Sequence, residues 1–206
     1  MRETGELDAE LVEWAEQAWK YFENNYQPTT GLVNSAHGYP STTLWDTASY
    51  LLGMISAHRI GVIDDEVFDA RLTQALDSLS KLPLVDGIAP NKAYHTVSLE
   101  MVDYTNQPTP DGIGWSAIDT ARLLVPLQAI VWEYPEYTPL VRNVVSRWDF
   151  DAIVVEGELF GAERDATGEL EHLQEGRLGY EEYAAKSFTL FGLDVADALL
   201  YDDHLE

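Results

Sequence analysis

The chain contains no cysteine, and this absence excludes disulfide bonds, thiolate metal sites and cysteine nucleophiles. Basic residues are also scarce: 12 lysines and arginines stand against 36 acids, which gives a formal net charge of -24. A surface of this charge repels nucleic acid and anionic membranes. We therefore expect neutral, cationic or metal-bound partners and no polynucleotide ligand.

Long hydrophobic runs are absent as well. No apolar stretch of the sequence approaches the roughly 20 residues that a bilayer span requires. Met1 is not followed by the basic and then apolar segments of a secretory signal. We therefore expect the chain as written to be soluble and not to span a membrane. Hydrophobic residues still make up 46% of the chain, which is enough for the core of one folded domain.

Motifs of several enzyme classes are missing too. The sequence has no G-x-S-x-G elbow, no phosphate-binding glycine loop, no HExxH pair and no EF-hand loop. Its histidines do not show the spacing of metal ligands. We therefore expect neither a metal nor an organic cofactor.

Helical periodicity is the main pattern that the sequence does contain. Apolar residues recur every three or four positions over residues 11–26, which predicts one amphipathic helix. Candidate inner helices begin near residues 44, 115 and 178, and the last is expected to run to about residue 200. More amphipathic, outward-facing helices are predicted after the first two, at 64–83 and 138–150.

Long polar segments separate these helices, near residues 25–43, 84–113 and 151–176. The last segment contains an alternating run that predicts a short strand or hairpin. The helix starts recur every roughly 65 to 70 residues, which indicates stacked helical hairpins. We predict a single, mainly α, toroid-like domain over residues 1–206 with short β-hairpin insertions, and we expect function at the end where the inner helices begin.

The candidate inner helices open in a similar way, with an aromatic residue beside or near an acid: Trp45 and Asp46, Trp115 and Asp119, Tyr180 and Glu181. Aromatic rings can pack on sugar C–H faces, and carboxylates can bind hydroxyls or perform acid–base chemistry. Alternatively, acids in a first turn only stabilise the helix dipole, and tryptophans at helical spacing belong to the core. The three openings together favour an acidic, aromatic-walled cleft.

Asp119 and Arg122 lie three residues apart on one helical face, and this spacing favours a structural ion pair between them. The stretch "EGRLGYEEYAAKSF" raises the same question at the third helix. Glycines and first-turn acids are what a well-capped helix start requires. The additional Glu175, Arg177 and Tyr180 exceed that requirement and point to the rim of a site.

Several blocks, read in order, resemble one known family: "QPTTGLVNSAHGYPSTTLWDTASYLLGMISAHRIGVI", "GWSAIDTARLL", "YPEY" and "EGRLGYEEYAAKSFTLFGLD". They look like the bacterial domain of unknown function 3131, over about residues 14–200. That family is similar to (α/α) toroids of the glucoamylase-like kind, which include β-glucan hydrolases and envelope-polysaccharide proteins. The resemblance implies a secreted, periplasmic or membrane-attached full-length protein.

The resemblance also places motif positions at the rim of a cleft: Trp45, Asp46, Trp115, Asp119, Arg122, Glu175, Arg177, Tyr180 and Glu181. The sequence departs from the pattern in length, because it supplies about three hairpins of a six-hairpin toroid. It therefore resembles the N-terminal half to two-thirds of the family fold. It is expected to be a fragment, a natural short form, or a piece that completes its apolar surface as a homo-oligomer.

From these patterns we predict a carbohydrate-active, glycoside-hydrolase-like domain that acts on or binds a bacterial envelope or extracellular polysaccharide. Asp46 and Glu181 are the first candidate catalytic carboxylates, with Asp119 third. The remaining candidates are substrate contacts: Tyr39, Trp45, Tyr94, Trp115, Arg122, Glu175, Arg177 and Tyr180. The alternatives are a non-catalytic glycan- or protein-binding module and a structural fragment of a larger protein.

Overall fold

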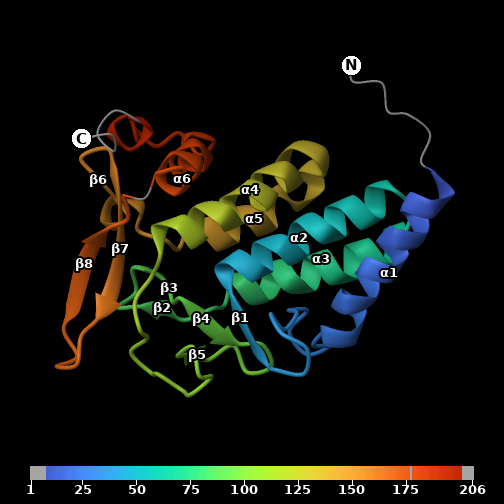
Figure 1. The fold of residues 1–206 in the computed structure, drawn as a ribbon, viewed down its shortest axis with the longest axis horizontal. Coiled ribbons are helices and arrows are strands. Elements are labelled where there is room, and N and C mark those ends of the chain that lie inside the picture. The colour runs from blue at the N-terminus through green and yellow to red at the C-terminus, as the bar shows by residue number, and fades with distance from the viewer. Residues whose placement is uncertain (1–7, 177, 201–206) are drawn as a thin grey trace.

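The computed structural model describes residues 8–176 and 178–200, and its described part is a helical domain with short strands at one end (Figure 1). The α-helices in chain order are α1 Ala9–Asn25, α2 Leu44–Arg59, α3 Asp65–Leu79, α4 Ala117–Glu133, α5 Thr138–Val145 and α6 Tyr180–Thr189. Short 3-10 turns lie after α4 at Pro135–Tyr137, after α5 at Phe150–Ala152 and after α6 at Asp197–Leu199. No helix in the described ranges is both long and apolar enough to cross a membrane.

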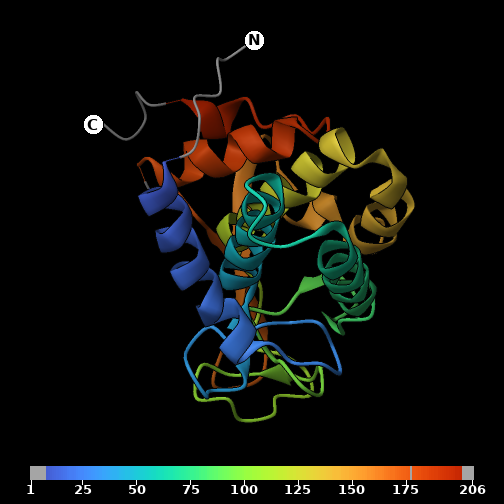
Figure 2. The ribbon, with the colours of Figure 1, turned by 90° about the vertical axis from the view of Figure 1, so that its right-hand side faces the viewer.

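The helices form two layers. Helix α4 packs between α2 and α6, while α3 and α5 pack on each other and cover α2 and α4 from outside. Helix α1 lies on the other side of α2 from α3, as Figure 2 shows. This arrangement explains why α2 and α4 are apolar over most of their circumference: each is covered by neighbours on several sides.

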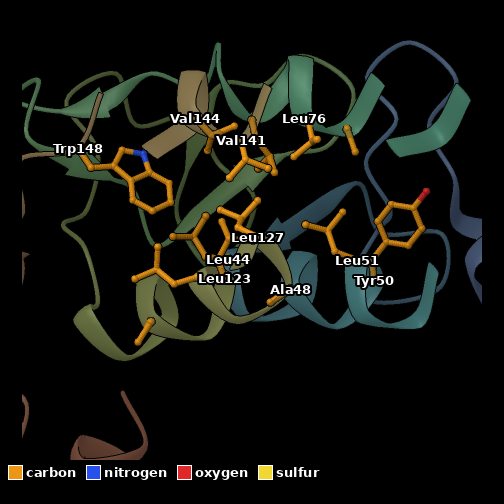
Figure 3. Packing of buried hydrophobic residues seen from close by; sticks show 14 of the residues in the cluster. Leu44, Ala48, Tyr50, Leu51, Leu76, Leu123, Leu127, Val141, Val144 and Trp148 are labelled. Atoms are coloured by element: carbon orange, nitrogen blue, oxygen red, sulfur yellow. The ribbon is translucent and has the colours of Figure 1, made fainter. Parts of the chain in front are cut away.

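The core fills the space between the layers. Figure 3 shows aliphatic side chains of α2 and α4 facing those of α3 and α5, with Trp148 closing one end. The residues labelled there are Leu44, Ala48, Tyr50, Leu51, Leu76, Leu123, Leu127, Val141, Val144 and Trp148. Burial of such side chains stabilises the fold by about 1.5 to 3 kcal/mol each.

The strands lie in the long loops: β1 Ser41–Thr43, β2 Leu84–Val85, β3 Ala89–Pro90, β4 Ala93–His95, β5 Met101–Val102, β6 Val154–Val155, β7 Glu158–Arg164 and β8 Leu170–Gln174. They form three small antiparallel sheets, in the orders β1-β4-β5, β2-β3 and β6-β7-β8. The longest pairing joins β7 and β8, from Phe160 opposite Gln174 to Arg164 opposite Leu170. All three sheets lie toward the end of the domain where α2 and α4 begin (Figure 1).

Side-chain caps fix the starts of α2 and α4. Thr43 Oγ1 accepts the N–H of Asp46 at 3.2 Å, and its hydroxyl donates back to the Asp46 carboxylate at 2.8 Å. Ser116 Oγ accepts the N–H of Asp119 at 3.1 Å. Such caps satisfy N–H groups that have no partner within the helix. Each helix therefore begins at a defined residue, which fixes where its first acid points.

Strand β7 is fastened to the segment that leads into α4. Ala162 donates its N–H to the Trp115 carbonyl at 2.9 Å, and Arg164 donates to the Ile113 carbonyl at 3.1 Å. Between these bonds Gly114 has a φ of +115°, and a Cβ at this position would lie 2.0 Å from the Ala162 carbonyl oxygen. Only glycine permits this contact without moving the hairpin.

The predicted architecture is confirmed at its coarse level: a mainly helical domain with short β insertions. The prediction of one continuous helix over residues 178–200 is wrong, because α6 ends at Thr189. Gly192, with a φ of +80°, turns the chain out of the helix three residues later. The chain then forms only the short 3-10 turn at Asp197–Leu199.

Replacing Gly114 with alanine should destabilise the protein by about 3 kcal/mol or more, because the new methyl group meets backbone and the residue is held at positive φ. Gly168→Ala is the matched control: it has a φ of +88° but no atom near its Cβ position, so it should cost only about 1 kcal/mol. Urea unfolding of both variants measures the difference. Equal losses would contradict the proposed attachment of β7 to α4.

Candidate functional site

A cavity of about 740 Å³ lies where α2, α4 and α6 begin. We name it the acidic cavity, and its lining residues are Trp45, Lys92, Ser116, Ile118, Asp119, Glu163, Leu173, Gln174, Glu175 and Tyr180. The helices supply its aromatic and polar walls, and the β7–β8 hairpin supplies acids from the other side. A cavity of this size is in the range that accommodates small organic ligands.

Glu175 joins the hairpin to α4. Its carboxylate Oε2 accepts the N–H of Ile118 at 2.9 Å and the hydroxyl of Ser116 at 3.3 Å. Its own N–H donates to the Leu159 carbonyl at 2.9 Å, which ties the end of β8 to β7. A carboxylate in this position is stabilised by the positive end of the helix dipole. Glu175 therefore caps the start of α4 and also lines the cavity.

Asp119 is the most perturbed carboxyl group of the site. Its pKa is raised from the ordinary value of 3.8 to about 6, mainly by burial and also by the negative charges of Glu175 and Asp46, while Lys92 opposes the shift. Desolvation and like charges both disfavour the ionised form. Asp119 therefore keeps its proton into the weakly acidic range, which is the property required of a general acid.

Lys92 and Glu163 form a loose ion pair at the mouth of the cavity. Lys92 Nζ lies 4.0 Å from Glu163 Oε2, with the lysine side chain 15% exposed and the glutamate 63% exposed. Lys92 is held from the backbone as well, because its N–H donates to the Gly114 carbonyl at 3.0 Å. Among the described residues that line the cavity, Lys92 is the one base. Glu163 remains open to a ligand.

A second pocket, of about 390 Å³, adjoins the first and shares Trp45 and Tyr180 with it. We name it the aromatic pocket; its lining residues are Trp45, Arg122, Leu178, Gly179, Tyr180 and Tyr183. The Arg122 guanidinium lies over the Trp45 ring, 5.0 Å from its centroid, and Nη1 donates to the Tyr183 hydroxyl at 3.1 Å. The two pockets thus differ in chemistry, since one is lined by acids and the other by rings around an arginine.

The structure brings several of the predicted residues together. Trp45, Asp119, Glu175 and Tyr180 all line the acidic cavity, and Arg122 lines the aromatic pocket. These residues come from the beginnings of α2, α4 and α6 and from the segment before α6. The first turns of these helices therefore meet in space.

Asp46 and Glu181 occupy other places. Asp46 is bonded to its cap Thr43 and lines a separate small pocket with Tyr21, although its charge still acts on Asp119. Glu181 is only 2% exposed, and its Oε1 accepts from Gln174 Nε2 at 2.7 Å. Neither residue lines the acidic cavity, and the structure thus separates the expected first catalytic pair from the cavity that Asp119 lines.

The expected sugar platforms also need correction. Tyr94 and Trp115 are fully buried, so neither ring has a face to offer a ligand. The Tyr94 hydroxyl donates to the Pro83 carbonyl at 2.7 Å, and Trp115 Nε1 donates to the Phe160 carbonyl at 3.2 Å. Both rings are core residues with satisfied polar atoms. Tyr39 is exposed but lines neither pocket, and its hydroxyl donates to the Tyr104 carbonyl at 3.4 Å.

Two further expectations concern arginines. The predicted ion pair between Asp119 and Arg122 is not formed, because the guanidinium turns toward Trp45 and Tyr183 instead. The expected substrate contact Arg177 lies outside the described residues. No group of three or more His, Asp or Glu residues suited to a metal ion occurs within 8–176 and 178–200.

Sequence reasoning missed Lys92, Glu163 and Tyr183. Lys92 and Glu163 belong to long loops, and they meet only because the β7–β8 hairpin folds back on the start of α4. The alternating pattern over residues 158–164 predicts a strand, but not which face of it reaches the cavity. Tyr183 lies one turn after Tyr180 on the same helix, and this i, i+3 spacing was the available signal.

Several solved structures share this arrangement of helices. A putative glucoamylase from Bacteroides fragilis matches with a TM-score of 0.57 and 16% identity, over 78% of this chain and 41% of that chain. The endo-β-1,2-glucanase of Chitinophaga pinensis, solved with sophorotriose and glucose, matches with a TM-score of 0.56 and 14% identity, over 75% of this chain and 40% of that one.

A β-1,2-glucanase from Parabacteroides distasonis has a TM-score of 0.58 at 14% identity, over 79% of this chain and 24% of its own. This chain therefore spans about two fifths or less of the length of these proteins. At such identities the likeness concerns the fold alone, which this chain shares with a putative glucoamylase and two β-1,2-glucanases.

The chain itself belongs to the family described as "Protein of unknown function (DUF3131)", whose family model matches residues 13–206. No protein with a curated description matches the sequence. The family resemblance expected from the sequence blocks is thereby confirmed, and the match covers every residue of both pockets.

Replacing Asp119 with asparagine should stabilise the fold at about pH 7 and leave it unchanged at about pH 4. In the folded chain its pKa is raised to about 6, so ionising Asp119 costs stability as the pH rises from about 4 to 6, and the loss persists above that range. Asparagine cannot ionise. We expect a gain of about 1 to 2 kcal/mol, allowing for partial solvent exposure.

Urea unfolding at the two pH values measures this gain. Asp151→Asn, which changes an exposed acid of the 3-10 turn at Phe150–Ala152, is the matched control and should show no pH-dependent difference. A loss of stability in Asp119→Asn at both pH values would contradict the raised pKa of the Asp119 carboxyl group.

Proposed function

We propose that this chain is a carbohydrate-active domain that cleaves a bacterial envelope or extracellular polysaccharide in its acidic cavity. The main support for this proposal is the state of Asp119. Its carboxyl group is half-buried, lines an open cavity and has its pKa raised to about 6. A glycosidase requires such an acid to protonate the leaving oxygen. The glycoside-hydrolase-like fold of the solved relatives supports the same class of reaction.

Asp119 takes the role of general acid in this proposal. The second carboxylate is Glu163, because its side chain is 63% exposed at the cavity mouth and its one described ion pair, to Lys92, is a loose 4.0 Å contact. It would act as base or nucleophile on the other side of the bond. Glu175 is less suited to that role, because its Oε2 is already bonded to the start of α4.

The remaining residues have supporting roles. Asp46 adds, after burial and Glu175, to the shift that raises the pKa of Asp119, and it would do so without contact with the sugar. Glu181 fixes α6 against the hairpin through Gln174. Trp45 and Tyr180, which border both pockets, provide ring faces on which a pyranose can pack. Since this chain matches about two fifths of the glucoamylase structure, we propose these residues as this domain's share of the substrate cleft.

A non-catalytic glycan-binding module is the second candidate. It is favoured by the number of acids already engaged in structure, since Glu175 caps α4 and Glu181 is buried. A binding module would use the same rings and acids as hydrogen-bond acceptors but would not depend on the protonation of Asp119. The two candidates therefore differ in how the pH and the Asp119 side chain affect turnover.

A glycan array followed by reducing-end release on the bound glycans tests the proposal. Asp119→Asn and Glu163→Gln should each lower kcat/KM by about 100-fold or more while changing glycan affinity by less than about threefold. Glu158→Gln is the control, because Glu158 is exposed on β7 with its side chain on the strand face opposite to that of Glu163. Binding without cleavage by the parent protein would support the glycan-binding module instead.

The pH dependence of cleavage gives an independent check. Because the general acid must carry its proton, kcat/KM should fall about tenfold per pH unit above about pH 6, following the raised pKa of Asp119. A rate that is constant through this range, or one that rises, would contradict the role of Asp119. Failure of every glycan on the array to bind would contradict the function as a whole.

A further inference from the structure

Arg122 is an unusual base in this chain. Acids outnumber bases threefold, yet none of the five ion pairs found within residues 8–176 and 178–200 includes Arg122. Its guanidinium is instead held by rings, with Trp45 beneath it and Tyr183 at Nη1. A half-buried guanidinium without a carboxylate partner still has N–H groups that an anion of a ligand could accept from.

The guanidinium is also fixed in orientation. Nε is buried and has no hydrogen-bond partner, and Nη1 is bonded to Tyr183, so the remaining N–H groups lie on the terminal nitrogens. The guanidinium lies over the Trp45 ring and the side chain borders the aromatic pocket, so these N–H groups are the ones that can meet a ligand there. A planar, pre-oriented edge of this kind matches a carboxylate, which it can bind through two parallel hydrogen bonds.

The surroundings of Arg122 are apolar and aromatic. The aromatic pocket is completed by Leu178, Tyr180 and Tyr183, and no acid lines it among the described residues. The adjoining acidic cavity contains Asp119, Glu163 and Glu175 instead. A negative group on a ligand would be repelled from the acidic cavity and attracted by Arg122, so the two pockets impose a direction on a charged ligand.

We infer that the aromatic pocket binds a uronic-acid unit of an acidic oligosaccharide, with its carboxylate on Arg122 and its ring against Trp45 and Tyr180. The neighbouring uncharged unit then occupies the acidic cavity, because the two pockets share Trp45 and Tyr180. This inference rests on the proposed function. It narrows the substrate to glycans in which uronic acids alternate with uncharged sugars or stand at the end of the chain. Arg122 is the residue that determines this specificity.

The experiment compares one uronic-acid-containing oligosaccharide with its carboxyl-reduced counterpart, which differs only at that group. In isothermal titration the parent protein should bind the acidic form at least about tenfold more tightly than the reduced form. Arg122→Met should remove the preference, so that it binds the acidic and the reduced sugar with equal affinity. Arg122→Lys should retain part of it, because the charge remains but the fork of donors does not.

Arg142→Met is the matched control, because Arg142 is exposed on α5 and makes no described side-chain contact. It should leave both affinities unchanged. If Arg122→Met does not fold, the comparison of the two sugars on the parent and on Arg122→Lys still decides the question.

Equal affinity of the parent for the acidic and reduced sugars would overturn the inference and leave the proposed function intact. A preference that persists in Arg122→Met would overturn it as well, since the carboxylate would then be bound elsewhere. Failure of both sugars to bind, together with silence of the glycan array, would instead overturn the proposed function itself.

Discussion

The site depends on the attachment of the β7–β8 hairpin to the start of α4. Two backbone bonds join β7 to residues 113 and 115, and the Glu175 carboxylate completes the connection by accepting the N–H of Ile118. Gly114 makes this approach sterically allowed. The attachment of the hairpin to α4 thus also brings two further carboxylates, Glu175 and Glu163, to the cavity that Asp119 lines. Without it, α4 would still form from its own periodicity, but Asp119 would lose the neighbouring Glu175 charge that helps to raise its pKa.

The charge of the chain has two consequences at this site. Burial and the acids around Asp119 make its proton harder to remove, which is the property that the proposed general acid requires. In a chain with three times as many acids as bases, an arginine without an acid partner is unusual. Arg122 is such a residue, and aromatic rings hold it beside the acidic cavity. Opposite electrostatic preferences in two adjoining pockets offer a way to orient a chain of sugars that carries charge on some units only.

The residues that could be predicted from the sequence are those whose position follows from helical periodicity. Trp45, Asp119 and Tyr180 lie in first turns of helices that the apolar pattern had placed in parallel, so their meeting was foreseeable. The burial of Tyr94 was not, because it depends on a strand register set by the distant pairing of β1 with β4. The same limit applies to Lys92 and Glu163. They lie close together only because the β7–β8 hairpin folds back on the start of α4, and no local sequence pattern marks either residue.

Asp119 holds its proton into the weakly acidic range because of burial and of neighbouring carboxylates. The most direct measurement is an NMR titration of the Asp119 carboxyl carbon in the folded protein. We expect a midpoint at about pH 6, and a lower midpoint in Glu175→Gln, since a negative charge is removed. A midpoint near the ordinary value of 3.8, unaffected by the Glu175 substitution, would contradict this expectation.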